Sequence, residues 1–284
     1  MNIAILWALA SLVCAGLVDL TYKRYAMRAR SRGVFLCGMG AVWLVLQSVV
    51  VLANQQHFTL DATTVRYGLA AGLAVTLSNL LLIEAMTHLD VSLGSTIYRL
   101  NTIAVVALAF IFLGETISVF ALLGIASGVT AVVFLYQRQD TGGMAHLPRL
   151  FLSIAILAAL LRATFGVVSK AALEANANYP GLLIIGATCW MVGGFAYSAW
   201  RERPIRFDWQ SASLTLFGGL VVFGTVNTLL LALQYGNASV VIPVANLGFT
   251  LALIIGVAWG MERLTMRKCV AMLFAVVAIF LLSV

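Results

Sequence analysis

Charged residues are scarce in this sequence. Of its 284 residues only 10% are charged and 4 are proline, whereas 62% are hydrophobic. A chain with so few polar side chains cannot cover the outside of a water-soluble globule. The composition therefore excludes a soluble protein and predicts one whose solvent is lipid.

Motifs for catalysis and cofactors are also lacking. The four cysteines (Cys14, Cys37, Cys189 and Cys269) lie in or at the ends of apolar segments and form no close pair, which argues against a disulfide framework or a metal site. The sequence has no phosphate-binding glycine loop, serine nucleophile motif or ATP-hydrolysing domain. We expect no enzyme, no metal, no cofactor and no primary pump. The net charge of +7 does not indicate nucleic-acid binding, because no basic helix lies outside the apolar segments.

Long apolar runs are what the sequence has instead. A bilayer core requires about 20 apolar residues per helix, and runs near that length recur ten times. They are residues 3–22, 33–53, 67–86, 92–113, 117–136, 151–170, 180–199, 213–234, 238–259 and 264–283. These runs predict an all-α integral membrane protein with ten transmembrane helices. The first run has no basic stretch before it, so we expect it to remain as a span rather than to be cleaved as a signal peptide.

The sequence is duplicated. A shift of 147 positions places Lys23 on Lys170 and Trp43 on Trp190 without a gap. A unit of five helices has an odd number of spans, so the second copy must enter the membrane inverted, which is an architecture of secondary transporters. The predicted units are residues 1–137 and 150–284, two inverted five-helix repeats joined by a cytoplasmic linker at 138–149.

Most of the 17 basic residues fall in the loops after the first, fifth, seventh and ninth predicted helices. These four loops share one face of the predicted bundle. Because basic residues accumulate in cytoplasmic loops, we expect this face in the cytoplasm and both termini outside, in the inner membrane.

Two short segments flank the fourth predicted helix and recur around the ninth. They are Leu89-Asp90-Val91-Ser92 and Leu113-Gly114-Glu115, followed by Gly236-Asn237-Ala238-Ser239 and Gly260-Met261-Glu262. This pattern resembles the EamA type of the drug/metabolite transporter superfamily over essentially the whole chain. The resemblance implies ten helices, a central cavity between the halves, and export or exchange of small metabolites. It also implies cytoplasmic termini, which the basic loops contradict. Such loose motifs specify the fold far better than the substrate.

Ionisable side chains inside the spans are the first candidates for a site, because each costs about 2.5 kcal/mol or more at mid-span. Arg99 shares a helical face with Ser95 and Thr102, and Tyr98 flanks this face. The repeat shift of 147 positions places Arg99 on Asn246. A guanidinium beside an amide suits a carboxylate or phosphate held by two hydrogen bonds. The alternative is that Arg99 pairs with an internal acid and only holds the bundle together.

Arg162 lies in the middle of the sixth predicted helix, and its repeat equivalent is Ala15. We expect it to contact the substrate or to form an ion pair with Asp19 or Glu84. Glu84 and Asp19 are also the candidates for proton coupling, with His88 as a relay. Alternatively, Glu84 and His88 reach interfacial water at the helix end.

Four further side chains are predicted to line the cavity. They are Asn79, Asn227, Trp43 and Trp190. The two asparagines require partners in hydrocarbon, and the two tryptophans offer aromatic faces to a ligand. Packing is the alternative for the tryptophans.

Two acids and two glycines are predicted to be structural. Glu115 and Glu262, one repeat apart, are expected to cap the helix that follows each of them. Gly124 and Gly128 allow close backbone approach, so we expect helix five to pack against helix ten, or else against a second copy of the chain.

The predicted function is secondary active transport of a small polar metabolite by alternating access, by a monomer or a homodimer. The two arginines favour a solute with a carboxylate or phosphate, such as an amino acid or organic acid. The alternatives are proton-coupled export of cationic or amphipathic compounds, flipping of a lipid-linked headgroup, and a receptor that binds without translocating.

Overall fold

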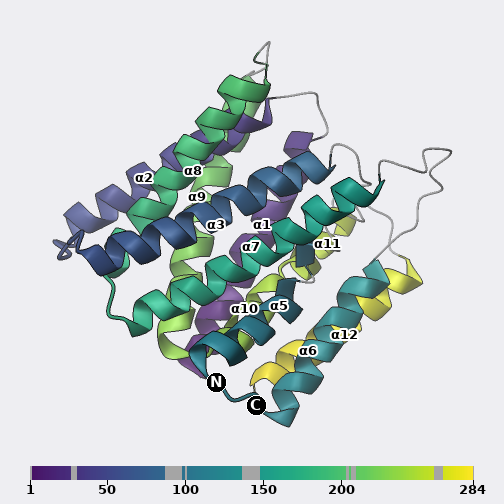
Figure 1. The fold of residues 1–284 in the computed structure, drawn as a ribbon. Helices are drawn as coiled ribbons and strands as arrows, with labels where there is room; N and C mark the ends of the chain where they lie inside the picture. The colour runs from purple at the N-terminus through teal and green to yellow at the C-terminus, as the bar shows by residue number, and fades with distance from the viewer. Residues whose placement is uncertain are drawn as a thin grey trace.

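The structure is a computed structural model that describes residues 2–26, 31–86, 98–99, 101–135, 148–202, 205, 209–258 and 265–283. The first half contains α1 (Ile3–Ala26), α2 (Arg32–Ala53), α3 (Ala62–Met86), α5 (Asn101–Leu108), the π-helical turn η1 (Ala109–Leu113) and α6 (Val119–Leu135). The second half contains α7 (Pro148–Glu174), α8 (Tyr179–Arg201), α9 (Trp209–Tyr235), α10 (Ala238–Asn246), α11 (Phe249–Ala258) and α12 (Met266–Ser283). Since η1 continues α5 and α11 continues α10, each half supplies five spans (Figure 1), which confirms the predicted fold class.

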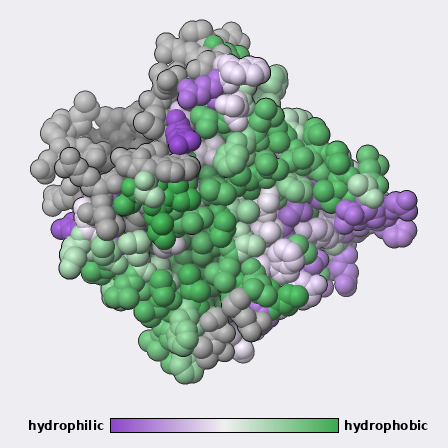
Figure 2. All heavy atoms as spheres, turned by 180° about the vertical axis from the view of Figure 1, so that it is seen from behind, coloured by the Kyte–Doolittle hydropathy of each residue, from purple (hydrophilic) through white to green (hydrophobic). Residues whose placement is uncertain are grey.

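Lipid-facing surface covers much of the molecule. Six of the described helices, α1, α2, α3, α7, α8 and α9, are long and apolar enough to cross a membrane. Their outward side chains include large hydrophobic ones such as Val45 of α2 and Phe195 of α8, which are 61% and 66% exposed. Figure 2 shows a broad hydrophobic face with hydrophilic groups gathered towards its edge. This surface fits a hydrocarbon solvent rather than water.

The two halves pack against each other in opposite directions. Cβ atoms added to Gly33 and Gly40 of α2 would meet the backbone of Ser198 and Met191 of α8, at 2.7 and 2.5 Å. Since the residue number rises along α2 while it falls along α8, the two helices are antiparallel. Residues that are 147 positions apart also touch: the rings of Trp43 and Trp190 meet edge to face with centroids 6.0 Å apart. A pseudo-two-fold axis therefore runs across the helices, and the repeats are inverted.

The chain ends lie together at one end of the bundle (Figure 1). We call this end the terminal side. The opposite end, where Arg24, Arg32, Arg201 and Arg267 lie in terminal turns of their helices, is called the basic side. An even number of spans returns the chain to the side on which it began, so this arrangement agrees with ten crossings.

The ninth span is broken, which the prediction of a continuous helix over 238–259 missed. Helix α10 contains Pro243 and ends at Asn246, and α11 begins at Phe249. At the break, the N–H of Thr250 donates to the carbonyl of Leu247 at 2.9 Å and not to that of Asn246, four residues back. The carbonyl oxygen of Asn246 is thereby left available for another donor, as in the discontinuous helices of transporters.

Candidate functional site

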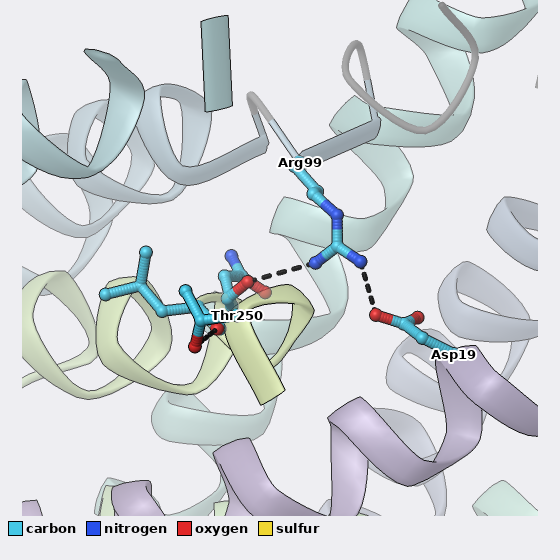
Figure 3. Close-up of polar contacts among 5 residues, drawn as sticks. Asp19, Arg99 and Thr250 are labelled. Carbon is cyan, nitrogen blue, oxygen red and sulfur yellow. Dashed lines mark hydrogen bonds and ion pairs between the residues drawn. The ribbon is translucent and has the colours of Figure 1, made fainter. Parts of the chain in front are cut away.

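Arg99 lies where the fourth span meets the break between α10 and α11 (Figure 3). Its Nη1 donates a hydrogen bond of 3.1 Å to the backbone oxygen of Asn246. Its Nη2 forms an ion pair with the Asp19 carboxylate of α1, and its guanidinium lies over the Phe249 ring, 4.9 Å from the centroid. Both arrangements foreseen for Arg99 thus occur together: it faces its repeat equivalent, and it pairs with an internal acid.

The side chain of Asn246 joins the two crossing spans. Its Nδ2 donates to Oδ1 of Asn101 at 2.6 Å and to Oγ1 of Thr102 at 3.1 Å. The Thr102 hydroxyl also lies 3.3 Å from the carbonyl of Arg99, to which it donates. Asn101 and Thr102 are 2% and 7% exposed. These bonds compensate for the burial of the amide and hold the position of Arg99 relative to α10.

Two glycines bring Asp19 to this crossing. A Cβ on Gly16, one turn before Asp19 on α1, would lie 2.6 Å from the carbonyl oxygen of Gly248. A Cβ on Gly248 would lie 2.7 Å from the carbonyl oxygen of Leu12. The backbone of α1 therefore rests directly on the break, which only glycine permits on both sides. This close approach places the carboxylate within reach of Arg99.

A second arginine, Arg162, adds positive charge inside the bundle. Arg162 lies close to the midpoint of α7, and its guanidinium is 5.3 Å from the centroid of the Phe165 ring. The buried hydroxyl of Tyr22 is within electrostatic range of Arg162, Asp19 and Tyr98, and has no hydrogen-bond partner among the described residues. Within the described chain Arg162 forms no ion pair; of its two expected partners, Asp19 pairs with Arg99 and Glu84 with Arg201. Arg162 is thus a positive charge without a carboxylate partner among the described residues, near the same Tyr22 hydroxyl as Asp19.

A small cavity lies beside Arg99, between the fourth and ninth spans and the pair formed by α6 and α12. It holds about 10 Å³, close to the room that one water molecule needs. Its polar wall consists of Arg99, Thr102 and Asn246. The rest of the lining is apolar and includes Gly128 and Val132 of α6.

Gly124 of α6 packs closely against α12 of the same molecule. A Cβ on Gly124 would lie 2.8 Å from Cγ of Leu282 on α12, so this glycine is required for the close approach of the two helices. Ser127 donates a hydrogen bond of 2.7 Å to the carbonyl of its repeat equivalent Phe274. Helices α6 and α12 therefore cross on the pseudo-two-fold axis.

Glu84 lies near the basic end of α3 and is bound by α8. Its Oε1 accepts a hydrogen bond of 2.7 Å from Arg201 and its Oε2 one of 3.1 Å from the Tyr197 hydroxyl. Arg201 is 56% exposed. The pair lies at the helix end, away from the Arg99 crossing.

The predicted asparagines have partners within the bundle. Nδ2 of Asn227 donates to Oε1 of Gln47 at 2.9 Å, and the Tyr179 hydroxyl donates to the backbone oxygen of Asn227 at 3.1 Å. Nδ2 of Asn79 donates to the carbonyl of Val75, one turn earlier, at 2.7 Å. Trp43 and Trp190 are 1% and 5% exposed, and neither indole N–H has a partner among the described residues.

Glu115 caps a helix, but not the one that follows it. Its two carboxylate oxygens accept the amide N–H groups of Ala238 and Ser239, at 2.7 and 2.9 Å, at the start of α10. Gly114, with φ of 64°, ends η1 in the left-handed conformation that directs Glu115 towards the second half. Ser118 caps α6 instead, through a 3.0 Å bond from the N–H of Ala121. The expected target was wrong because the partner amides come from the other repeat.

Three predicted residues, Ser95, His88 and Glu262, lie outside the described residues. Phe249 and Gly248, in contrast, were not singled out from the sequence. A glycine two positions after an intramembrane asparagine was the available signal for a break in the helix. Among the described residues, no three His, Cys, Asp or Glu side chains lie together as a metal site would need.

The comparisons agree with this architecture. The model of the EamA-like transporter family matches residues 2–137 and, a second time, residues 149–284. A solved structure, described only as "Crystal structure of protein", is similar in fold with a TM-score of 0.82, over 98% of this chain and 95% of its own, at 12% sequence identity. No curated protein matches the sequence. The chain belongs to the EamA-like transporter family and is a multi-pass membrane protein.

Proposed function

We propose that this protein is a secondary active transporter for a small solute that bears a carboxylate or phosphate, such as an amino acid or organic acid. The observation that carries the proposal is an excess of positive charge near Tyr22. Arg99 pairs with Asp19, whereas Arg162, which forms no ion pair among the described residues, lies within electrostatic range of the same Tyr22 hydroxyl as Asp19. An intramembrane guanidinium without a carboxylate partner is costly, and an anionic solute supplies the missing partner.

Arg99 retains capacity to bind such a solute. A guanidinium has five N–H donors, and two of them are used by Asn246 and Asp19. The side chain is 19% exposed. A carboxylate held between Arg99 and Arg162 would accept charge-assisted hydrogen bonds from both, each contributing about 1.5 to 3 kcal/mol.

Alternating access is supported by the way α10 is held. This half-helix is bound by Glu115 of the first repeat at its start, and by Arg99 and Asn101 of the first repeat at its end. If the inverted halves rocked against each other, the contacts at the start of α10 would loosen when those at its end tighten, and the reverse. The broken ninth span is therefore the element that we expect to open and close the terminal side.

We place the basic side in the cytoplasm and both termini outside, in the inner membrane, because the basic residues at the described helix ends follow the positive-inside rule. A reporter fused to the C-terminus tests this placement. Activity of a reporter that works only outside the cytoplasm supports it, and activity of a cytoplasmic reporter contradicts it.

Flux into liposomes tests the function. The purified protein would be reconstituted and assayed with labelled amino acids, organic acids and sugar phosphates. We expect saturable flux of at least one anion, with KM raised about tenfold to a hundredfold by Arg162→Gln and unchanged by Arg201→Gln at the basic end. Flux of cations only, flux of lipid only, or saturable binding without flux would each overturn the proposal.

A further inference from the structure

We propose that the cavity beside Arg99 receives a short, unbranched aliphatic group of the substrate, and that Gly128 sets how long this group can be. The inference rests on the proposed function, because it assumes that the anionic end of the same solute binds Arg99. It adds a specificity-determining position and narrows the substrate to a carboxylate or phosphate with a small apolar group next to its charge.

The cavity suits an apolar group better than water. A buried water molecule needs two to four polar partners. Asn246 and Thr102 already bind each other and their neighbours, and the donors of Arg99 that remain free are the ones proposed to bind the anionic end of the solute. The remaining wall, which includes Val132, is apolar. A volume of about 10 Å³ is too small for a branched or aromatic group unless the walls move.

Gly128 has space above its Cα that packing does not explain. A Cβ built on it would meet Cβ of Ala278 at 3.7 Å and Cδ2 of Leu247 at 3.8 Å, both ordinary contacts. Gly124, one turn earlier, differs because Leu282 leaves no room for a methyl group there. Glycine inside a helix is less favourable than alanine by about a factor of five in equilibrium. Packing therefore does not require glycine at position 128. Since Gly128 lies in the wall of the cavity, we infer that its missing side chain keeps the cavity open.

Two substitutions of opposite effect test this inference. Gly128→Ala places a methyl group in the cavity, and Val132→Ala enlarges it. Val133→Ala is the matched control, because Val133 is the next residue on α6 but is 53% exposed, whereas Val132 is 5% exposed. Each protein would be titrated with straight-chain carboxylates, 2-amino acids and alkyl phosphates of increasing length, and ligand affinity measured from protection against thermal unfolding.

We expect the wild type to prefer a short member of one series. Gly128→Ala should lower the affinity for that member at least tenfold, and the preferred chain should become one carbon shorter. In Val132→Ala the preferred chain should become one carbon longer, and the affinity should rise about fourfold per added methylene. Val133→Ala should leave the preferred length unchanged. If Gly128→Ala fails to fold, the shift in Val132→Ala still decides the question.

Two other results distinguish a failure of the proposed aliphatic pocket from a failure of the proposed transport function. Binding with the same length preference in Gly128→Ala, Val132→Ala and the wild type would overturn the pocket and leave the anion transporter standing. Absence of binding by every member of all three series would overturn both.

Discussion

Arg99 and Asn246 are equivalent residues of the two repeats, 147 positions apart, and a hydrogen bond of 3.1 Å joins them. Two equivalent residues can touch only where the pseudo-two-fold axis passes between them. The Trp43–Trp190 and Ser127–Phe274 contacts mark two further points on the same axis. The candidate site therefore lies at the centre of the inverted pair, where relative motion of the halves acts on both sides of the membrane.

The Arg99–Asp19 pair should be coupled energetically. Arg99→Gln leaves a partly buried carboxylate without its partner, and we expect a loss of about 2 kcal/mol in stability. Asp19→Asn leaves Arg99 unpaired and should also destabilise the protein. The double variant should be more stable than Arg99→Gln, as thermal unfolding in detergent would measure. Strictly additive losses would show that the ion pair contributes nothing to the fold.

Glu115 should act mainly on folding. Glu115→Ala removes both acceptors from the start of α10, which costs about 1 to 2 kcal/mol for a helix cap. We expect less folded protein and a lower melting temperature, with transport per folded molecule changed less. Glu174→Ala is the control, since Glu174 lies on the terminal side and its side chain is 50% exposed. A normal melting temperature with abolished transport would assign Glu115 to transport itself.

Gly248→Ala should separate α1 from the break in the ninth span. The new methyl group would lie 2.7 Å from the carbonyl of Leu12 and 2.9 Å from the backbone nitrogen of Gly16, so a helix must shift. We expect a marked fall in the yield of monodisperse protein on size-exclusion chromatography. Gly128→Ala, which meets only ordinary contacts, serves as the control; equal yields of the two variants would contradict the close packing.

Trp190 tests packing against a role in the transport path. Its indole N–H has no partner among the described residues, so Trp190→Phe keeps most of the packing and should cost about 1 kcal/mol. Trp190→Ala should cost about 3 to 5 kcal/mol. Melting temperatures of the two variants would measure the difference. Loss of transport in Trp190→Phe at unchanged stability would instead indicate that the indole N–H contacts the substrate.

The global architecture was predictable because its signals are long and repeated. Apolar runs gave the spans, and the repeat shift placed Arg99 opposite Asn246. The break at Gly248 was missed because residues 238–259 form one largely apolar run of full span length and a single proline, Pro243, is tolerated in membrane helices.

The partners of charged groups were harder to predict. Asp19 and Glu84 were both within reach of Arg162 by sequence, yet the structure pairs Asp19 with Arg99 and Glu84 with Arg201. Glu115 was expected to cap the helix that follows it in sequence, although the backbone N–H groups that donate to its carboxylate lie in the other repeat. Such choices depend on how helices cross, which local pattern does not encode.

The most direct test of an anion site at the arginines is the melting temperature of the purified protein, measured with increasing concentrations of a transported carboxylate or phosphate. A ligand that binds the folded state raises this temperature as its concentration increases. We predict a clear rise for the wild type and for Arg201→Gln, and little or none for Arg162→Gln. An equal rise in all three proteins would contradict the site.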